Sequence, residues 1–284
     1  MTEKKNVSLP CAVGSTSYID TVKNSYYVDK TLLIRDLIDD HAAVTLFTRP
    51  RRFGKTLAVD MLKVFFEKTD EDNSVYFQDK KIWDCGEFYR KQQGAYPVIY
   101  ITFKDVKFDN WKDSLEAIRL VIRDEYMRHA DILSWDGLDV VEKDYLDRMQ
   151  KGTLSNVEYT RALLNLSRML EKYHNKKIVV LIDEYDTPFI EAKTGNFYQE
   201  LKGSLATLLR SSLKNSEDLK YAFITGIQRV AKENIFSDLN NLDVYTVCDR
   251  EYSEYFGFDS DETKKLLEYY GLELNNEVKE MYDG

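Results

Sequence analysis

The 284-residue sequence contains few of the residues that build disulfide frameworks or zinc sites. It has three cysteines, Cys11, Cys85 and Cys248, which lie far apart and form no C-x-x-C pair. Three histidines are equally scattered, with no spacing that indicates metal ligands or a Ser-His-Asp arrangement. We therefore expect reduced thiols in a cytoplasmic protein. The histidines, which we expect to face solvent or to cap helices, are His41, His129 and His174.

Long apolar runs and an excess of positive charge are also missing. No apolar run approaches the roughly 20 residues that cross a bilayer, and the N-terminal residues lack the apolar core of a signal peptide, so we expect no membrane partner. The net charge of −9 argues against broad, nonspecific nucleic-acid binding but does not exclude a local basic patch. The hydrophobic fraction of 43% is ordinary for a globular protein, and the length allows one large domain and a small one.

Short apolar runs alternate with longer segments of helical periodicity. This alternation predicts a three-layer α/β fold with a mainly parallel sheet. In such sheets, ligands bind beyond the carboxyl ends of the strands. The predicted strands are Ala43–Thr48, Pro97–Phe103, Ile178–Ile182, Tyr221–Thr225 and Val244–Val247.

Capping residues and apolar spacing mark the predicted helices. Asp113 and Glu116 are placed like an N-terminal capping pair, and Ser155 and Glu158 fit the capping box S-x-x-E. After Gly54, apolar residues recur at four-residue spacing, which predicts a helix face that packs against a core. The predicted helices are Asp29–Asp40, one beginning near Gly54, Asp113–His129, Ser155–Tyr173 and one around Tyr198–Lys214.

A basic loop that ends in Gly-Lys-Thr follows the first predicted strand. The loop TRPRRFGKT matches the end of the phosphate-loop pattern G-x-x-x-x-G-K-[ST], but Arg49 stands where the pattern has its first glycine. In this interpretation Gly54 lets the backbone approach the phosphates, Lys55 bridges the β- and γ-phosphates, and Thr56 places its hydroxyl on Mg²⁺. The alternative is a basic strand–helix turn that contains these residues by chance. The apolar strand before the loop and the apolar helix after it favour the phosphate loop.

Two carboxylates follow the third predicted strand, in the run KIVVLIDEYD. Asp183 comes directly after four apolar residues, as the magnesium carboxylate of a Walker B strand does. Glu184 is the next residue and is suited to polarise the water that attacks the γ-phosphate. The alternative is a strand that ends in a solvated turn, with Asp186 as a third exposed acid. The presence of Lys55 favours the catalytic interpretation.

Polar residues at and after the end of the fourth predicted strand, and in the basic loop, are further candidates. In ATPases with a catalytic glutamate, the strand between the loop strand and the acidic strand ends in a polar sensor, and Thr225 in YAFITGIQR fits that place. Arg229 follows and is a candidate sensor of the γ-phosphate; alternatively, Thr225 caps the strand and Arg229 is a surface charge. Arg49, Arg51 and Arg52 either offset the charge of a triphosphate or form a surface that docks another domain or a nucleic acid.

Six sequence blocks together resemble a known family. The chain contains, in this order, LPCAVGSTSYID, YYVDKT, TLFTRPRRFGKT, VLIDEYD, FITGIQRV and FSDLNNL. This order resembles the bacterial and archaeal AAA-ATPase-like family, whose members usually carry a PD-(D/E)XK-type nuclease domain after the ATPase. An arginine at the first glycine position matches that family. The resemblance implies ATP as the nucleotide, and it implies that Tyr27, Val28 and Asp29 line the adenine or position the first helix; alternatively, Asp29 is the N-cap of the helix that follows.

These motifs divide the chain into three predicted parts. Residues 1–42 form an N-terminal segment and helix that lead into the nucleotide site, and residues 43–250 form a P-loop ATPase core. Residues 251–284 contain a capped helix with a terminating glycine, which indicates the start of a small helical lid. The chain stops soon afterwards, so we expect it to be part of a longer protein. The long separation of Lys55 and Asp183 predicts extra material between the second and third strands, for which Asp131–Gly152 is the candidate.

The combined prediction is a three-layer P-loop NTPase of the ASCE/AAA-like type that binds Mg-ATP, hydrolyses it and controls a C-terminal nuclease-type effector. The alternatives are a nucleotide-dependent switch without hydrolysis, a small-molecule kinase or transferase, and a nucleic-acid module that acts through the arginine loop. A homo-oligomer is compatible with the sequence, and no nuclease activity is assigned to these residues. The predicted catalytic residues are Lys55, Glu184, Thr225 and Arg229, and the predicted Mg²⁺ ligands are Thr56 and Asp183. The predicted nucleotide contacts are Tyr27, Asp29, Arg49, Pro50, Arg51, Arg52, Phe53, Gly54, Lys55, Thr56 and Leu57.

Overall fold

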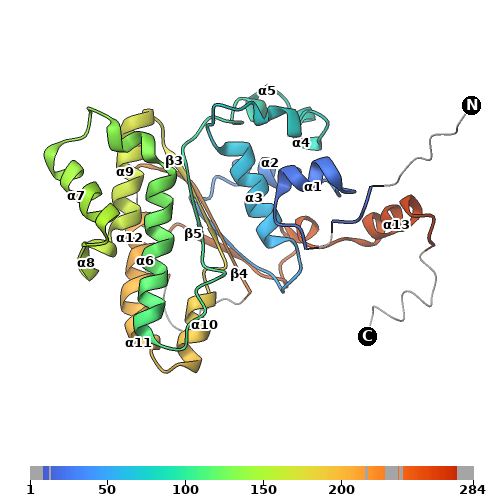
Figure 1. The fold of residues 1–284 in the computed structure, drawn as a ribbon. Helices are drawn as coiled ribbons and strands as arrows, with labels where there is room; N and C mark the ends of the chain where they lie inside the picture. The colour runs from blue at the N-terminus through green and yellow to red at the C-terminus, as the bar shows by residue number, and fades with distance from the viewer. Residues whose placement is uncertain (1–8, 13, 215–216, 228–235, 237–238, 274–284) are drawn as a thin grey trace, which may run out of the picture.

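The computed structural model describes residues 9–12, 14–214, 217–227, 236 and 239–273. Its centre is a five-stranded parallel sheet in the order β2-β3-β4-β1-β5, with helices on both faces (Figure 1). The predicted three-layer α/β fold is therefore confirmed. The strands are β1 (Val44–Thr48), β2 (Val98–Thr102), β3 (Ile178–Asp183), β4 (Leu219–Gly226) and β5 (Leu242–Tyr245).

Two helical layers cover the sheet, one on each side (Figure 1). One side carries α6 (Trp111–Arg128), α7 (Val140–Lys151), α8 (Asn156–Tyr159), α9 (Ala162–His174), α10 (Thr187–Thr194), α11 (Tyr198–Leu201) and α12 (Thr207–Leu213). The other side carries α1 (Tyr18–Asn24), α2 (Leu32–Asp39), α3 (Lys55–Phe66), α4 (Lys81–Asp84) and α5 (Glu87–Arg90), with α13 (Ser260–Tyr269) at its outer end. Short 3-10 turns lie at Asn73–Tyr76, Ala130–Ser134 and Ser253–Tyr255.

Alternate residues of the strands face two separate hydrophobic cores. Strand β3 is buried along its whole length, as expected for a parallel strand that is covered on both faces. Val180 and Ile182 belong to the core under α6 and α9, whereas Val179 and Leu181 belong to the core under α3. Because side chains alternate along a strand, Asp183 continues the second series and faces the layer that contains α3.

The start of α6 differs from the prediction. The N-cap is Asn110, whose side chain accepts the backbone N–H of Asp113 at 3.0 Å. The predicted capping pair of Asp113 and Glu116 is therefore wrong. Asparagine is among the most favoured N-cap residues, and it lets the helix begin earlier, at Trp111. Asp113 instead lies in the first turn, where its charge is favourable to the helix dipole.

The helix predicted for Ser155–Tyr173 is divided into α8 and α9. Its capping box is confirmed, because Ser155 and Glu158 exchange both hydrogen bonds. Thr160 lies at the break and donates its hydroxyl to the carbonyl of Val157 at 2.7 Å. Such local side-chain hydrogen bonds compete with helix continuation.

Two other segments bear on the predicted element pattern. The region Asp131–Gly152 contains α7 and lies between β2 and β3, as predicted for extra material. The helix predicted around Tyr198–Lys214 is interrupted by a π-helical turn at Lys202–Ala206, which joins α11 to α12. Within the described parts of the chain, no helix has the length and apolarity needed to cross a membrane.

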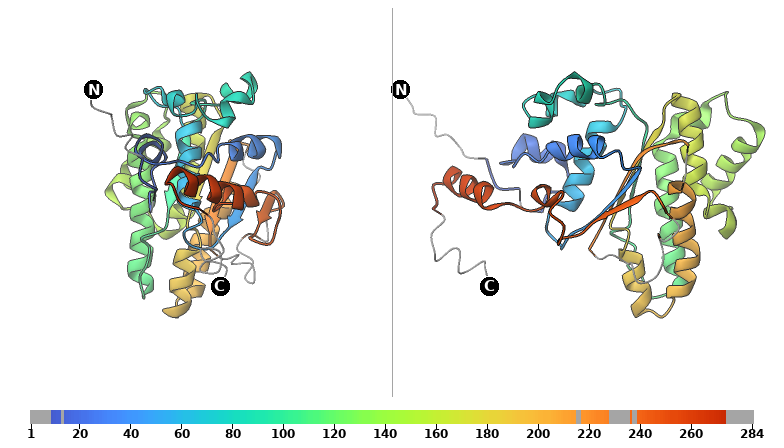
Figure 2. Two further views of the ribbon diagram at one scale, coloured as in Figure 1. Left: turned by 90° about the vertical axis from the view of Figure 1, so that its right-hand side faces the viewer. Right: turned by 180° about the vertical axis from the view of Figure 1, so that it is seen from behind.

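Residues 252–270, here called the strap, lie beside the N-terminal part of the chain (Figure 2). The ammonium of Lys30 is 2.6 Å from the carboxylate of Glu262, and the Tyr252 hydroxyl donates to the carbonyl of Asp36 at 3.2 Å. The described part of the predicted lid therefore packs against α2 and the residues that precede it.

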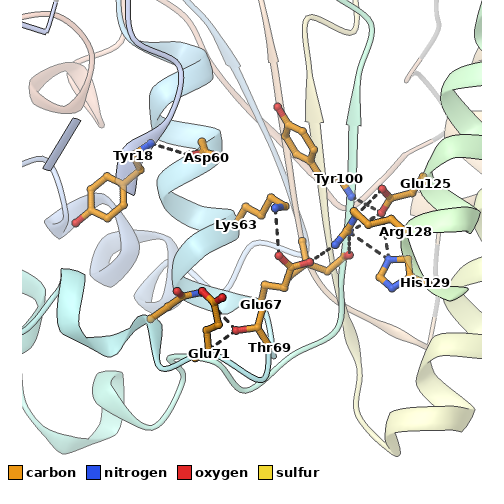
Figure 3. Close-up of polar contacts among 12 residues, drawn as sticks. Tyr18, Asp60, Lys63, Glu67, Thr69, Glu71, Tyr100, Glu125, Arg128 and His129 are labelled. Atoms are coloured by element: carbon orange, nitrogen blue, oxygen red, sulfur yellow. Dashed lines mark hydrogen bonds and ion pairs between the residues drawn. The ribbon is translucent and has the colours of Figure 1, made fainter. Parts of the chain in front are cut away.

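Side chains of α6 cover the outer edge of β2 (Figure 3). Glu125 accepts the backbone N–H of Tyr100 at 2.8 Å, and Arg128 donates to Glu125 at 2.7 Å and to a carbonyl of β2. Arg128 also pairs with Glu67 at the end of α3, so the network joins the two helical layers around this strand. His129, the C-terminal cap residue of α6, lies 3.2 Å from Glu125. These contacts occupy backbone positions that an added strand would use, so they close this edge of the sheet.

Candidate nucleotide-binding site

The loop between β1 and α3 has the backbone of an anion site. Arg52 has φ 69° and Gly54 has φ 77°, whereas the residues beside them are not left-handed, so the backbone alternates in hand along the loop. Such alternation turns successive N–H groups toward one concave face. Gly54 is the N-cap of α3 and has no side chain to accept the first helical amides. These amides and the helix dipole therefore favour a phosphate at this position.

Lys55 lies inside the loop and not on its surface. Its side chain is 6% exposed, and its ammonium donates to the carbonyls of Arg49 at 3.0 Å and Pro50 at 2.8 Å. Burial lowers the pKa of Lys55 below its ordinary value, and the nearby carboxylates of Asp183 and Glu184 act in the opposite direction. The ammonium is thus held by carbonyls of the loop, and it interacts electrostatically with the carboxylates of residues 183–186, here called the acidic turn.

Arg49, at the usual first glycine position, is directed away from the loop surface. Its side chain is 2% exposed, donates to the carbonyl of Tyr245 in β5 at 2.9 Å, and lies over the ring of Phe256 at 4.8 Å. Burial lowers the pKa of this guanidinium. Arg49 thus joins β1, β5 and the strap, whereas Arg51 and Arg52 are exposed. Of the three arginines, these two are the ones whose exposure suits contact with a triphosphate.

The carboxylate of Asp183 joins three elements of the fold. It is fully buried, and it accepts the hydroxyl of Thr56 from α3 at 2.7 Å and the hydroxyl of Thr225 from β4. Strand β4 lies between β1 and β3, which is the order that the sensor interpretation of Thr225 requires. The structure therefore brings together three residues that are far apart in the sequence.

Thr56 and Asp183 supply the kind of oxygen atoms that Mg²⁺ prefers. Among the residues that the structure describes, no group of three or more His, Cys, Asp or Glu side chains could hold a metal ion. Mg²⁺ in nucleotide sites does not need such a cage, because phosphate oxygens and water complete its octahedral shell. A buried carboxylate beside a threonine hydroxyl, directly after the loop between β1 and α3, is compatible with this mode of binding.

Glu184 occupies a strained turn at the end of β3. Its φ of 51° is in the left-handed region, which costs a non-glycine residue on the order of 1–3 kcal/mol. The next residue, Tyr185, donates its N–H to the carbonyl of Thr225 at 3.1 Å, which holds the turn against β4. One carboxylate oxygen of Glu184 accepts the hydroxyl of Thr187 at 3.1 Å. The half-buried carboxylate of Glu184 thus contacts the first residue of α10, and its backbone directly follows Asp183.

Asp186 is a residue of this region that the sequence interpretation underestimated. It is fully buried, and not exposed as the solvated-turn alternative requires. Its carboxylate accepts the backbone N–H of Ile227, directly after β4, at 2.9 Å. The glycine that ends β4, Gly226, was the available sequence signal, because a glycine there permits close approach of another chain segment.

Tyr27 and Asp29 lie on the side of α2 and α3, and their contacts are internal. Asp29 accepts the N–H of Thr31 at 2.9 Å and the N–H of Lys81 at 2.8 Å, so both of its oxygens stabilise starts of helices. The hydroxyl of Tyr27 is 3.4 Å from the sulfur of Met61, and burial raises its pKa. The N-cap of α2 is Thr31 and not Asp29, so the N-cap alternative is wrong, and Asp29 instead holds the turn that precedes the helix.

The remaining predicted contacts differ in their surroundings. Phe53 and Pro50 are exposed, and the carbonyl of Phe53 accepts the N–H of Gly257 in the strap at 3.2 Å. Leu57 is half-buried against the core under α3. Arg229 lies outside the described residues.

Comparisons with known proteins show the family to which the chain belongs. The family profile described as "Predicted AAA-ATPase" matches residues 12–236. An uncharacterised protein from Azotobacter chroococcum mcd 1, described by its place in the vnfD 5' region, is 28% identical over 289 residues, which cover 100% of this chain and 49% of that protein. This chain thus spans about half the length of that curated relative. No solved structure matches this chain. Because the profile covers most of the chain, including the loop, the acidic turn and β4, the chain belongs to the AAA-ATPase-like family of predicted AAA-ATPases.

Proposed function

We propose that the chain binds Mg-ATP and hydrolyses it to ADP and phosphate. The observation that carries the proposal is the buried Asp183 carboxylate, which accepts one hydroxyl from the first turn of α3 and one from the neighbouring strand. This arrangement joins the side of the site that would hold phosphate to the side from which water would attack. Membership of the family supports nucleotide binding, and the resemblance favours ATP.

Each residue of the proposed site has a role that its position supports. The loop amides and the ammonium of Lys55 would bind the β- and γ-phosphates. Thr56 and Asp183 would hold Mg²⁺, which offsets negative charge on the phosphate oxygens when bound. Glu184 would accept the proton of the attacking water. Thr225 would fix the carboxylate of Asp183 beside that reaction centre. Arg229 stays a sequence-based candidate for sensing the γ-phosphate.

Lys55→Ala tests nucleotide binding, with Lys107→Ala as a matched control. Lys55 is buried inside the loop, whereas Lys107 is exposed after β2. In an equilibrium titration with a fluorescent ATP analogue and Mg²⁺, we expect Lys55→Ala to bind on the order of tenfold more weakly and Lys107→Ala to bind like the parent. Equal affinity in the parent and in Lys55→Ala would contradict the assignment of the loop.

A nucleotide-dependent switch without hydrolysis is the second candidate. It is favoured by the hydrogen bond from Thr187 to Glu184, which occupies one of the carboxylate oxygens that a general base would present to water. For the switch, we expect tight binding of Mg-ATP and no phosphate release in the parent or in Thr187→Ala. Phosphate release by the parent excludes this candidate, and phosphate transfer to an added acceptor instead would indicate a kinase or transferase.

We also propose that nucleotide binding controls a further domain of nuclease type. The proposal is supported by the resemblance and by direct contacts between the loop and the strap. Gly257 donates to Phe53 at 3.2 Å, and Phe256 packs under Arg49. A change in the loop on nucleotide binding would therefore reach the strap. Hydrogen exchange at the Gly257 amide, compared with and without Mg-ATP, tests this connection, and unchanged exchange would contradict it.

A homo-oligomer that completes the site is a related proposal, tested by the molecular mass in solution with and without nucleotide.

A further inference from the structure

A second buried carboxylate lies three residues after Asp183 and has no part in the proposed chemistry. Asp186 is fully buried and is the N-cap residue of α10, but its side chain accepts no hydrogen bond from the helix that it precedes. Instead, one of its oxygens accepts the backbone N–H of Ile227 at 2.9 Å. A hydrogen bond from a backbone amide to a carboxylate is charge-assisted and therefore stronger than an ordinary one. Asp186 thus holds the residue that directly follows β4.

The acidic turn and the end of β4 approach each other closely at this point. A side chain on Gly226 would place its Cβ 2.8 Å from an oxygen of Asp186 and 2.6 Å from the ring of Tyr185. Tyr185 donates its N–H to the carbonyl of Thr225 at 3.1 Å, so hydrogen bonds continue between the two segments beyond the last strand pair. The carbonyl of Gly226 in turn accepts the N–H of Arg49 at 3.1 Å. The end of β4 is therefore held between the acidic turn and the phosphate loop.

We propose that Asp186 is a positioning residue of the nucleotide site. By holding Ile227, it fixes the end of β4 and so places the hydroxyl of Thr225 on Asp183 beside Glu184. This inference rests on the proposed ATP hydrolysis. Positions of reacting groups in enzymes matter on the scale of about 1 Å, and a displacement of that size costs on the order of a hundredfold in rate. The hydrogen bond of Asp186 reaches the end of β4, whereas the ammonium of Lys55 is held by hydrogen bonds to loop carbonyls, so Asp186 would affect turnover more than nucleotide affinity.

The test compares Asp186→Ala with Asp186→Asn. The asparagine side chain keeps a carbonyl oxygen that can accept the same N–H, whereas alanine removes the acceptor. We expect Asp186→Ala to bind Mg-ATP within about threefold of the parent but to release phosphate about 10- to 100-fold more slowly in a single turnover. We expect Asp186→Asn to release phosphate at least about tenfold faster than Asp186→Ala. Glu125→Gln is the matched control, because Glu125 is also a buried carboxylate that accepts a backbone N–H, but at the far edge of β2. Glu125→Gln should be less stable than the parent but should release phosphate at the parent's rate per folded molecule.

Ile227→Pro provides an independent route to the same hydrogen bond, because proline has no N–H to donate. If Asp186 acts through this N–H, Ile227→Pro should slow turnover as Asp186→Ala does, and the double variant should be no slower than either. If Asp186→Ala does not fold, Asp186→Asn and Ile227→Pro carry the comparison.

Three results would overturn the positioning role. These are parent-like turnover in Asp186→Ala, no recovery in Asp186→Asn, and a loss of binding as large as the loss of rate. If the parent binds Mg-ATP without releasing phosphate, hydrolysis is refuted, and the positioning role must be tested by hydrogen exchange instead of by turnover. In that case, faster exchange of the Tyr185 amide in Asp186→Ala than in Asp186→Asn would support the role, and equal exchange would refute it.

Discussion

Removal of the Thr225 hydroxyl should destabilise the protein even without nucleotide. In Thr225→Val, the fully buried Asp183 carboxylate loses one of the two hydroxyl donors that hold it, while the side-chain volume changes little. Hydrogen bonds to charged groups contribute about 1.5–3 kcal/mol, so we expect the free energy of unfolding to fall by about 2 kcal/mol. Thr45→Val is the matched control. Thr45 is equally buried on β1, and no hydrogen bond joins it to a carboxylate within the described residues.

Urea unfolding of the parent, Thr225→Val and Thr45→Val measures this difference directly. The midpoint of Thr225→Val should fall without a change in slope, because the hydroxyl does not alter the surface exposed on unfolding. Thr45→Val should be neutral or slightly stabilising, since it replaces a buried hydroxyl by a methyl group. In single-turnover phosphate release, Thr225→Val should be about 10- to 100-fold slower than Thr225→Ser, which keeps the donor. A free energy of unfolding within about 0.5 kcal/mol of that of Thr45→Val would refute the reasoning.

Three further perturbations test contacts around the site. Burial alone would raise the pKa of Glu125, but hydrogen bonds from His129 and Arg128 hold this pKa below its ordinary value. The ionised Glu125 therefore stabilises the fold above its unfolded-state pKa, and this stabilisation is lost as the pH falls. Glu125→Gln should thus cost about 2 kcal/mol at neutral pH in urea unfolding, and the difference should shrink below about pH 4; a difference independent of pH would contradict this. Gly226→Ala should lower the unfolding free energy by about 1–3 kcal/mol, because its Cβ would lie 2.6 Å from the ring of Tyr185 in the acidic turn. Parent-like stability would show that the end of β4 and the acidic turn can move apart without cost. Tyr255→Phe removes a hydroxyl that donates to α2 and should increase proteolysis within the strap, whereas unchanged cleavage would show that the strap is held by other contacts.

The fold was largely predictable because its central strands are rich in buried apolar residues, whereas β5, with the exposed Asp243, begins at Leu242, two residues before the predicted strand. Residues buried on both faces of a parallel sheet, such as those of β1 and β3, need no alternation with polar residues, so their length and sequence alone identify them. The missed features depend on single polar side chains. Asn110 starts α6 earlier than expected, and the hydroxyl of Thr160 accompanies the break between α8 and α9. The packing of the strap on α2 rests on contacts such as Lys30 with Glu262, which have no local signature in the sequence.

The candidate site was predictable where topology determines it. Parallel strands end at the same edge of the sheet, so Asp183 and Thr225 had to lie near the loop once their strands were identified. The direction of individual side chains was not predictable. Arg49 follows β1 like its exposed neighbours but is buried against β5, and Asp186 is buried because Gly226 admits it. Both orientations depend on segments that are distant in the sequence, which a local pattern cannot show.

The most direct test of ATP hydrolysis at this site is single-turnover phosphate release by the parent and by Glu184→Gln, with Mg-ATP binding measured on both. We predict phosphate release by the parent, its loss by on the order of a hundredfold or more in Glu184→Gln, and equal nucleotide affinity in the two proteins. Because glutamine keeps the size of the side chain but cannot accept the proton, this result would assign the general base to Glu184. Equal rates in the two proteins, or tight binding with no release in either, would contradict hydrolysis by this residue.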